Sequence, residues 1–206
     1  MLFLPAGSLR FWQGWLFLLL QAGFWTYFTF DFLKRDPKLL ERRMQRKESQ
    51  PQQRWFQRLW MIIAIPAFIL ASLDFRFGWT RRWTGELPVA VVLLAQGIVI
   101  GGYWVVFWVM KTNTFAASVI QVESSQTVIE AGPYSLVRHP MYTGIVLTML
   151  ATPLALGSLV TLPLFALCVP LLIFRLIFEE RLLRQSLPGY ADYCQRTRFR
   201  LIPGIW

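Results

Sequence analysis

The residues of this chain best suited to chemistry surround its single histidine, His139. Arg138 and Pro140 flank it and Tyr142 follows, at the edge of a hydrophobic segment. A residue before proline is biased towards extended backbone, and proline suits the first turn of a helix, so we expect a helix to begin at Pro140. The N–H groups of that helix start, together with the Arg138 guanidinium, predict a seat for a carboxylate or phosphate.

A second polar cluster ends the last hydrophobic segment. Arg175 precedes Glu179 by four residues, so the two share a helix face, and Glu180 follows directly. Arg175 lies inside the apolar run, where an unpaired cation is costly. Adjacent carboxylates suit a bound cation or ammonium group; the alternative is an Arg–Glu pair that only reaches out to the interface.

A third cluster lies in the C-terminal tail, where Tyr190 and Tyr193 are three residues apart in a short amphipathic stretch. These rings could stack on a base such as adenine, or they could be interfacial aromatics. Three such clusters on one face of a membrane favour a site over isolated structural pairs.

The composition indicates an all-α integral membrane protein. Hydrophobic residues make up 55% of the chain and charged residues only 16%. The net charge of +10 is then expected to encode orientation rather than nucleic-acid binding. With one histidine and no cysteine cluster (Cys168 and Cys194 lie apart), we expect no metal site and no disulfide framework.

About five transmembrane segments are expected, from the roughly 20 apolar residues that a spanning helix needs. The first is interpreted as a retained segment and not a signal peptide. The second and fourth are short, and the last two are expected to form a tight helical hairpin followed by a cytosolic amphipathic tail. The segments are Phe11–Phe30, Leu59–Leu73, Leu87–Met110, Tyr142–Leu156 and Leu159–Phe178.

Basic residues predict the orientation, because short cytosolic loops are rich in lysine and arginine. The loop after the first segment is far more basic than the next loop, which places the N-terminus outside and both the 111–141 loop and the tail in the cytosol. A weaker signal, Gly97-x-x-x-Gly101, predicts close helix packing, more plausibly within the chain than in a dimer. The basic residues of the first loop are Lys34, Arg35, Lys38, Arg42, Arg43, Arg46, Lys47, Arg54 and Arg58, against Arg76, Arg81 and Arg82 in the next.

The motifs resemble those of the isoprenylcysteine carboxyl methyltransferase family and its phospholipid-methyltransferase relatives. The resemblance runs from about Asn113 to the C-terminus, and the N-terminal half is similar only in hydropathy. The chain accordingly divides into a three-helix transmembrane region, 1–110, and a catalytic region, 111–206. The motifs are Gly-Pro-Tyr at 132–134, Arg-His-Pro-x-Tyr-x-Gly at 138–144, Glu179-Glu180, Gly-Tyr-x-x-Tyr at 189–193 and Arg-Leu-Ile-Pro at 200–203.

The resemblance implies a membrane methyltransferase that uses S-adenosylmethionine without a Rossmann domain, and no Gly-x-Gly-x-x-Gly occurs here. It implies a cytosol-facing cofactor pocket formed by the last two helices, the loop before them and the tail, with a lipophilic or prenylated acceptor entering from the bilayer. Arg138, Arg175 and Glu179 become the catalytic candidates, with the two arginines on the acceptor carboxylate. The cofactor-pocket candidates are Tyr134, Val137, His139, Pro140, Tyr142, Glu179, Glu180 and Tyr190.

The same resemblance favours a compact prokaryotic form in a bacterial inner membrane and leaves the acceptor open. Carboxyl O-methylation needs no general base, since a carboxyl group, whose pKa in water is about 4, is already ionised at neutral pH. N-methylation of a phospholipid amine needs a proton acceptor, His139 or a glutamate. Two further alternatives are a membrane sterol or enone reductase, with Arg196, Arg198 and Arg200 on the phosphates of a nicotinamide dinucleotide, and a non-catalytic scaffold.

Overall fold

The protein is an elongated helical bundle in which four helices are long and apolar enough to cross a membrane. The computed structural model describes residues 2–37, 51–113 and 127–206, and their regular elements are all helical. Because these helices expose many large apolar side chains, the bundle needs a lipid environment. The elements are α1 (Phe3–Ala6), α2 (Trp12–Arg35), α4 (Pro51–Phe77), α5 (Trp79–Thr84), α6 (Val89–Thr112), η1 (Gly132–Ser135), α7 (Pro140–Ala155), η2 (Leu159–Thr161), α8 (Leu162–Ser186) and α9 (Tyr190–Arg196).

The expected helical membrane fold and the hairpin of α7 and α8 are confirmed, but four helices of the described residues, rather than about five, have spanning length. The second segment is longer than the predicted Leu59–Leu73, because Arg54–Phe77 forms one helix of spanning length. The hydropathy pattern ended at Leu73 because Asp74 and Arg76 interrupt it, yet the helix continues through both. α7 has only 16 residues, about 24 Å, which is shorter than a bilayer core of about 30 Å.

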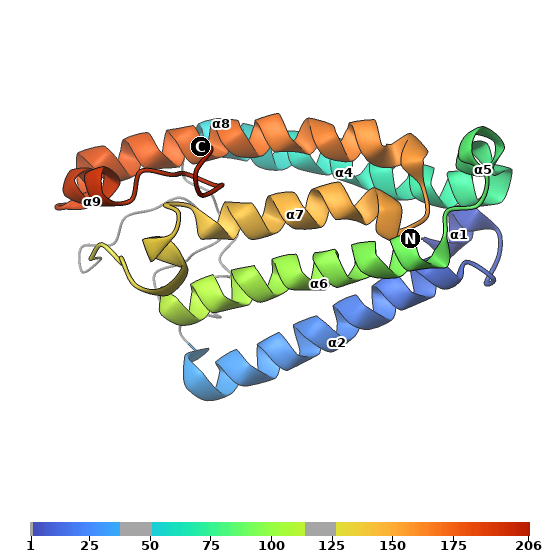
Figure 1. The fold of residues 1–206 in the computed structure, drawn as a ribbon, viewed down its shortest axis with the longest axis horizontal. Helices are drawn as coiled ribbons and strands as arrows, with labels where there is room; N and C mark the ends of the chain where they lie inside the picture. Colours follow the sequence, from blue (N-terminus) through green and yellow to red (C-terminus); the bar gives the residue numbers. More distant parts are fainter. Residues whose placement is uncertain (1, 38–50, 114–126) are drawn as a thin grey trace.

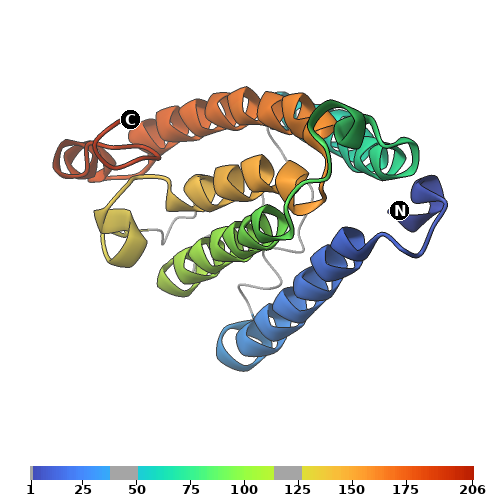
Figure 2. The same cartoon turned by 45° about the vertical axis from the view of Figure 1, so that its right-hand side comes forward.

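α7 lies between α6 and α8, so it is shielded on both sides, whereas α2 diverges from the bundle (Figures 1 and 2). The hairpin turn after α7 depends on Gly157, whose φ of +72° is favourable only for glycine. Near this turn a buried link joins three segments. Asp74 accepts hydrogen bonds from the backbone N–H and the hydroxyl of Thr80, and the Thr80 hydroxyl accepts one from the Leu159 N–H at 2.9 Å.

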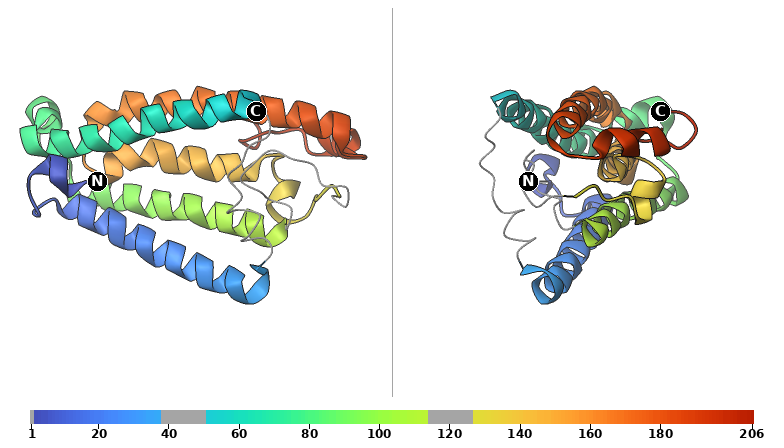
Figure 3. Two further views of the ribbon diagram at one scale, coloured as in Figure 1. Left: turned by 180° about the vertical axis from the view of Figure 1, so that it is seen from behind. Right: turned by 90° about the vertical axis from the view of Figure 1, so that its left-hand side faces the viewer.

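The opposite end of the bundle gathers η1, the start of α7, the end of α8, α9 and the C-terminus (Figure 3). α2 and α6 also end there, so the loops predicted to be cytosolic leave the bundle on one face. Which side of the membrane this face occupies stays a prediction, as does the division of the chain at residue 110. Most of the basic loop, residues 38–50, lies outside the described residues.

The close approach of α6 and α7 occurs at glycines other than the predicted pair. Among the described residues a Cβ on Gly97 or Gly101 would meet nothing within 4 Å, so the prediction of close packing there within the chain is wrong, while packing in a dimer stays a prediction. Gly102 instead packs on Gly144, and a Cβ on Gly102 would lie 2.6 Å from the Gly144 carbonyl oxygen. The helical period explains the error, because Gly102 lies about 100° around the helix from Gly101 and on the buried face.

Gly102→Ala is therefore expected to lower the thermal stability of the protein, because the added methyl meets backbone that cannot rotate away. Overpacking of this kind costs about 1–3 kcal/mol, against which the better helix propensity of alanine returns up to about 1 kcal/mol. Gly101→Ala is the matched control and is expected to be neutral or slightly stabilising. Melting curves of the two detergent-solubilised variants decide, and an equal Tm for both would contradict the assigned packing.

Candidate active site

The loop before α7 folds as its residue types predict. His139 is non-helical, with φ −126° and ψ 60°, and α7 begins at Pro140. The C-terminal tail pairs with this loop: the Arg138 N–H donates to the Phe199 carbonyl and the His139 N–H to the Arg200 carbonyl, both at 2.9 Å. The tail therefore holds Arg138 and His139 against the bundle.

Glu180 is the centre of the polar cluster. Its side chain is buried, at 4% exposure. One carboxylate oxygen lies 3.2 Å from the Arg138 guanidinium and 2.9 Å from that of Arg184, and the other lies 2.7 Å from Nε of Arg200. His139 adds its Nε2 at 3.7 Å. Side chains from α8, from the loop before α7 and from the C-terminal tail thus contact one carboxylate. The sequence predicted that the histidine and the paired acids would lie close together.

Glu179 has a different environment from its neighbour. It is more exposed than Glu180, and its Oε2 accepts a hydrogen bond of 2.6 Å from the Tyr142 hydroxyl. The same hydroxyl accepts a bond of 3.1 Å from Nε of Arg175, which is buried. Tyr142 therefore joins the cation and the carboxylate that one turn of α8 separates.

The tyrosines of the tail are buried rather than exposed for stacking. Tyr190 and Tyr193 pack together with ring centroids 5.7 Å apart, and the Tyr193 hydroxyl donates to the Tyr134 carbonyl at 2.8 Å. Burial raises the pKa of Tyr134 to about 12, so this phenol stays protonated at neutral pH. Burial also raises the pKa of Tyr190. The two rings therefore act as core.

Three buried polar atoms near Glu180 have no hydrogen-bond partner within the described ranges. They are Nε of Arg138, Nε2 of His139 and the Tyr190 hydroxyl. His139 Nε2 lies 3.7 Å from the Glu180 carboxylate, longer than an ordinary hydrogen bond. Because an unpaired buried polar group costs about 1–3 kcal/mol, these atoms favour binding of a polar ligand. Hydrogen-bond donors and a partly exposed acceptor carboxylate, Glu179, fit the zwitterionic amino-acid end of S-adenosylmethionine.

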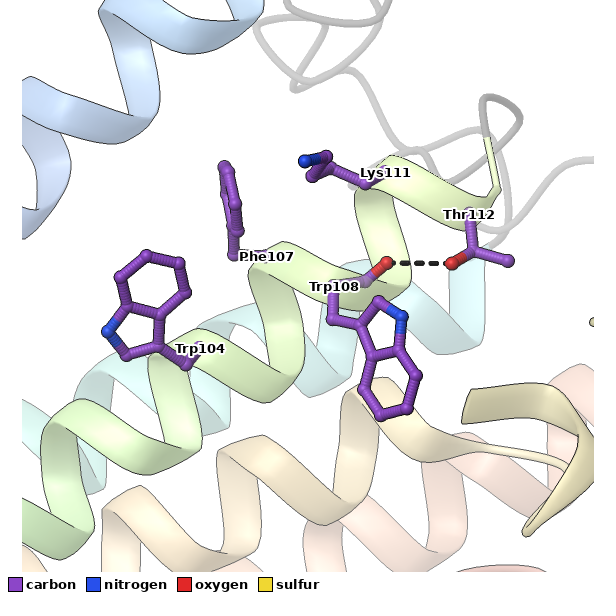
Figure 4. Close-up of a pocket in the computed structure, with 5 residues that line it drawn as sticks. All are labelled: Trp104, Phe107, Trp108, Lys111 and Thr112. Atoms are coloured by element: carbon purple, nitrogen blue, oxygen red, sulfur yellow. Dashed lines mark hydrogen bonds between the residues drawn. The ribbon is translucent and has the colours of Figure 1, made fainter. Parts of the chain in front are cut away.

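A cavity of about 450 Å³ lies along the end of α6 (Figure 4). Gly132 of η1 borders it, since a Cβ there would lie 3.1 Å from the Thr112 hydroxyl and 3.5 Å from Nε1 of Trp108. The described lining is Trp104, Phe107, Trp108, Lys111 and Thr112. The wall is thus mainly aromatic, with one cation, beside the Gly-Pro-Tyr motif.

The structure brings all the predicted site residues to one end of the bundle, although their assigned roles stay predictions. Val137 and Pro140 are buried beneath the loop. Arg138 faces Glu180 and also donates to the Cys194 and Thr197 carbonyls at 3.4 Å, which engages it within the protein. Sequence reasoning missed Phe56, whose ring lies under the Arg175 guanidinium, with 4.9 Å between Cζ and the ring centroid. Its segment carries no motif that could have revealed it.

The fold and this end of the bundle define an integral membrane protein with its polar cluster at one face. Residues 90–188 match the model of the phospholipid methyltransferase family. The structure resembles that of a eukaryotic intramembrane Ras methyltransferase, isoprenylcysteine carboxyl methyltransferase, with a TM-score of 0.58 and 20% identity, over 78% of this chain and 55% of that one. The chain is therefore similar to the phospholipid methyltransferase family over residues 90–188, and its fold is like that of isoprenylcysteine carboxyl methyltransferase.

Two curated bacterial proteins are also similar. The cobalt-zinc-cadmium resistance protein CzcN of Cupriavidus metallidurans is 29% identical over 142 residues, and the nickel-cobalt-cadmium resistance protein NccN of Alcaligenes xylosoxydans xylosoxydans is 26% identical over 145 residues. Each match covers 68% of this chain but only 60% and 61% of those relatives. The family match begins before Asn113 and ends before the motifs of the tail. The resemblance of the tail therefore rests on its motifs alone and not on the family match.

Proposed function

We propose that the protein is an S-adenosylmethionine-dependent methyltransferase that O-methylates the carboxylate of a lipophilic, prenylcysteine-like acceptor. The observation that carries this proposal is the Tyr142 hydroxyl, which joins Arg175 to Glu179 beside the unpaired polar atoms of Arg138, His139 and Tyr190. Arg175, which can bind a carboxylate, thus lies close to Glu179, a partly exposed carboxylate that can bind a cationic donor. We place this end in the cytosol of a bacterial inner membrane, with the N-terminus outside.

The two glutamates divide the work. Glu180 is surrounded by Arg138, Arg184 and Arg200, so its charge is already compensated and it holds the site together. Glu179 faces one phenol hydroxyl and keeps a carboxylate that can offset the ammonium or sulfonium of the donor. His139 and Tyr190 can form hydrogen bonds with the methyl donor. The walls of the cofactor pocket are then formed by Tyr134, Val137, Pro140 and Tyr142.

The chemistry asks little of the side chains beyond positioning. S-adenosylmethionine, when bound, supplies a methyl group on a sulfonium, ready for in-line displacement by an anion. Arg175 orients the acceptor carboxylate as an ion pair, for which a guanidinium fork is suited. The carboxylate is already ionised, so no residue needs to take a proton, and positioning alone can supply several kcal/mol. The apolar surroundings exclude water that would otherwise solvate the nucleophile.

Binding measurements test the donor. S-adenosylhomocysteine is expected to raise the Tm of the detergent-solubilised protein, whereas NADPH is not, because Arg196 and Arg200 already contact Glu130 and Glu180. Glu179→Ala and His139→Ala are each expected to weaken S-adenosylhomocysteine binding about tenfold, the loss of one hydrogen bond to a charged group. Arg81→Ala, an exposed change at the far end, is the control. A Tm raised by NADPH alone would favour the reductase instead.

The methylated product identifies the acceptor chemistry. Methylation of a carboxylate gives a methyl ester, and alkali hydrolyses this ester and releases the labelled methyl group as methanol. A methyl group on a phospholipid amine is stable to the same treatment. We expect alkali-labile label with a prenylated cysteine acid as acceptor. Alkali-stable label in the lipid fraction would show N-methylation, with Glu179 or His139 as the proton acceptor.

A further inference from the structure

The N-terminal part of α4 lies against Arg175. α4 precedes the family-matched residues 90–188, so nothing in that match assigns it a role. Yet the Phe56 ring lies under the Arg175 guanidinium, with Cζ 4.9 Å from the ring centroid, and Trp60 supports Phe56 with its own ring centroid 5.7 Å away. The N-terminal half therefore contributes directly to the environment of Arg175.

Two side chains from different helices contact the guanidinium. Tyr142 accepts a hydrogen bond from Nε at 3.1 Å, and the guanidinium carbon lies over the Phe56 ring, 4.9 Å from its centroid. A planar guanidinium can bind a carboxylate as a bidentate pair, in exchange for bonds that it makes beforehand, when its orientation is fixed. The hydrogen bond and the ring contact together restrict that orientation.

The surroundings make this restraint effective. Arg175 is 9% exposed, and the apolar cluster that encloses Tyr142 and Leu176 includes Phe56, Trp60 and Trp206. A cation over an aromatic face gains more when water is excluded. The restraint on Arg175 also bears on the proposed site, because the Tyr142 hydroxyl that accepts from Arg175 donates to Glu179.

We propose that Phe56, supported by Trp60, is a positioning residue that holds Arg175 in the orientation that receives the carboxylate of the acceptor. This inference rests on the proposed function and extends it, because it makes α4 a determinant of selectivity for carboxylate acceptors. The residues proposed to bind the donor and the acceptor include side chains of α7 and α8. Phe56 lies on α4, outside the family match, and fixes the orientation of one of them.

The test separates aromatic stacking from apolar bulk. Phe56→Leu keeps an apolar side chain but removes the π face, while Phe56→Tyr keeps the face. Phe68→Leu is the matched control, since Phe68 is also partly buried on α4 but packs on Phe17 and Phe165, away from the site. The probes are N-acetyl-S-farnesylcysteine and its carboxamide, which lacks the anion. Their Kd values are measured with S-adenosylhomocysteine present, and KM and kcat for the acid with S-adenosylmethionine.

We expect Phe56→Leu to raise the Kd and KM of the acid about tenfold, as loss of a desolvated cation–π contact implies, and to leave the Kd of the carboxamide within about twofold. Phe56→Tyr and Phe68→Leu should keep both values near those of the wild type. An equal loss for acid and carboxamide, or no loss for either, overturns the positioning role while the methyltransferase stands. Wild-type protein that binds neither S-adenosylhomocysteine nor the acid overturns the proposed function itself, and the inference with it.

Discussion

Glu180→Ala is expected to destabilise the protein by about 3–5 kcal/mol and to release the C-terminal tail from the bundle. Removing one partner from a buried ion cluster leaves the others as uncompensated charges, and that cost exceeds the net stabilisation of the intact cluster. Arg138 is the side chain most affected, because it is 6% exposed and cannot reach water without moving. The tail follows, since Arg200 bonds Glu180 at 2.7 Å and carries the backbone that pairs with His139.

Unfolding of the detergent-solubilised protein and limited proteolysis of the tail measure this effect. Glu179→Ala is the matched control, because the adjacent carboxylate is partly exposed and contacts only the Tyr142 hydroxyl among described side chains. We expect it to lose about 1.5–3 kcal/mol, the contribution of one hydrogen bond to a charged group, and less than Glu180→Ala, while its main effect falls on donor binding. If Glu179→Ala proved the more destabilising of the two, the division of roles between the glutamates would be wrong.

The sequence predicted the meeting of the three clusters because their positions follow from chain topology. Two antiparallel helices joined by a tight turn must bring the start of the first beside the end of the second. His139 and Glu180 therefore lie at one level, 3.7 Å apart between Nε2 and Oε2. The apolar lengths of the segments likewise predicted the bundle, because a bilayer core requires about 20 residues per helix.

Which atoms pair at the site could not be predicted in this way. Hydropathy and spacing do not distinguish Glu179 from Glu180, although a rotation of about 100° around α8 turns one to the protein cations and leaves the other partly exposed. The tail tyrosines were ambiguous for the same reason, since a pattern of aromatic residues does not tell core from ligand platform. Side-chain packing between segments distant in sequence settles both, and so does the Phe56 contact of Arg175.

Arg175→Ala is expected to reduce kcat/KM for a lipophilic carboxylate acceptor at least about a hundredfold while donor binding stays within about threefold. Loss of an oriented, desolvated charge pair removes roughly 3 kcal/mol or more from the transition state, since each 1.36 kcal/mol is about tenfold in rate. Donor binding should survive because the Tyr142 hydroxyl lies between Arg175 and Glu179, the carboxylate assigned to the donor. Arg175→Lys should recover part of the loss, because lysine restores the charge without the planar fork.

The discriminating measurement is the full kinetic set for Arg175→Ala, Arg175→Lys and Arg138→Ala with one prenylated acid, beside the S-adenosylhomocysteine Kd of each. Both arginines are acceptor candidates, but Arg138 is held by Glu180 and by the tail carbonyls, whereas Arg175 meets the aligned Tyr142 and Phe56. Arg138→Ala should therefore lose stability and donor binding together, and Arg175→Ala should lose acceptor turnover alone. If a folded Arg175→Ala protein still methylated the acid, another cation would have to bind the acceptor carboxylate. The positioning role proposed for Phe56 of α4 would then be wrong too.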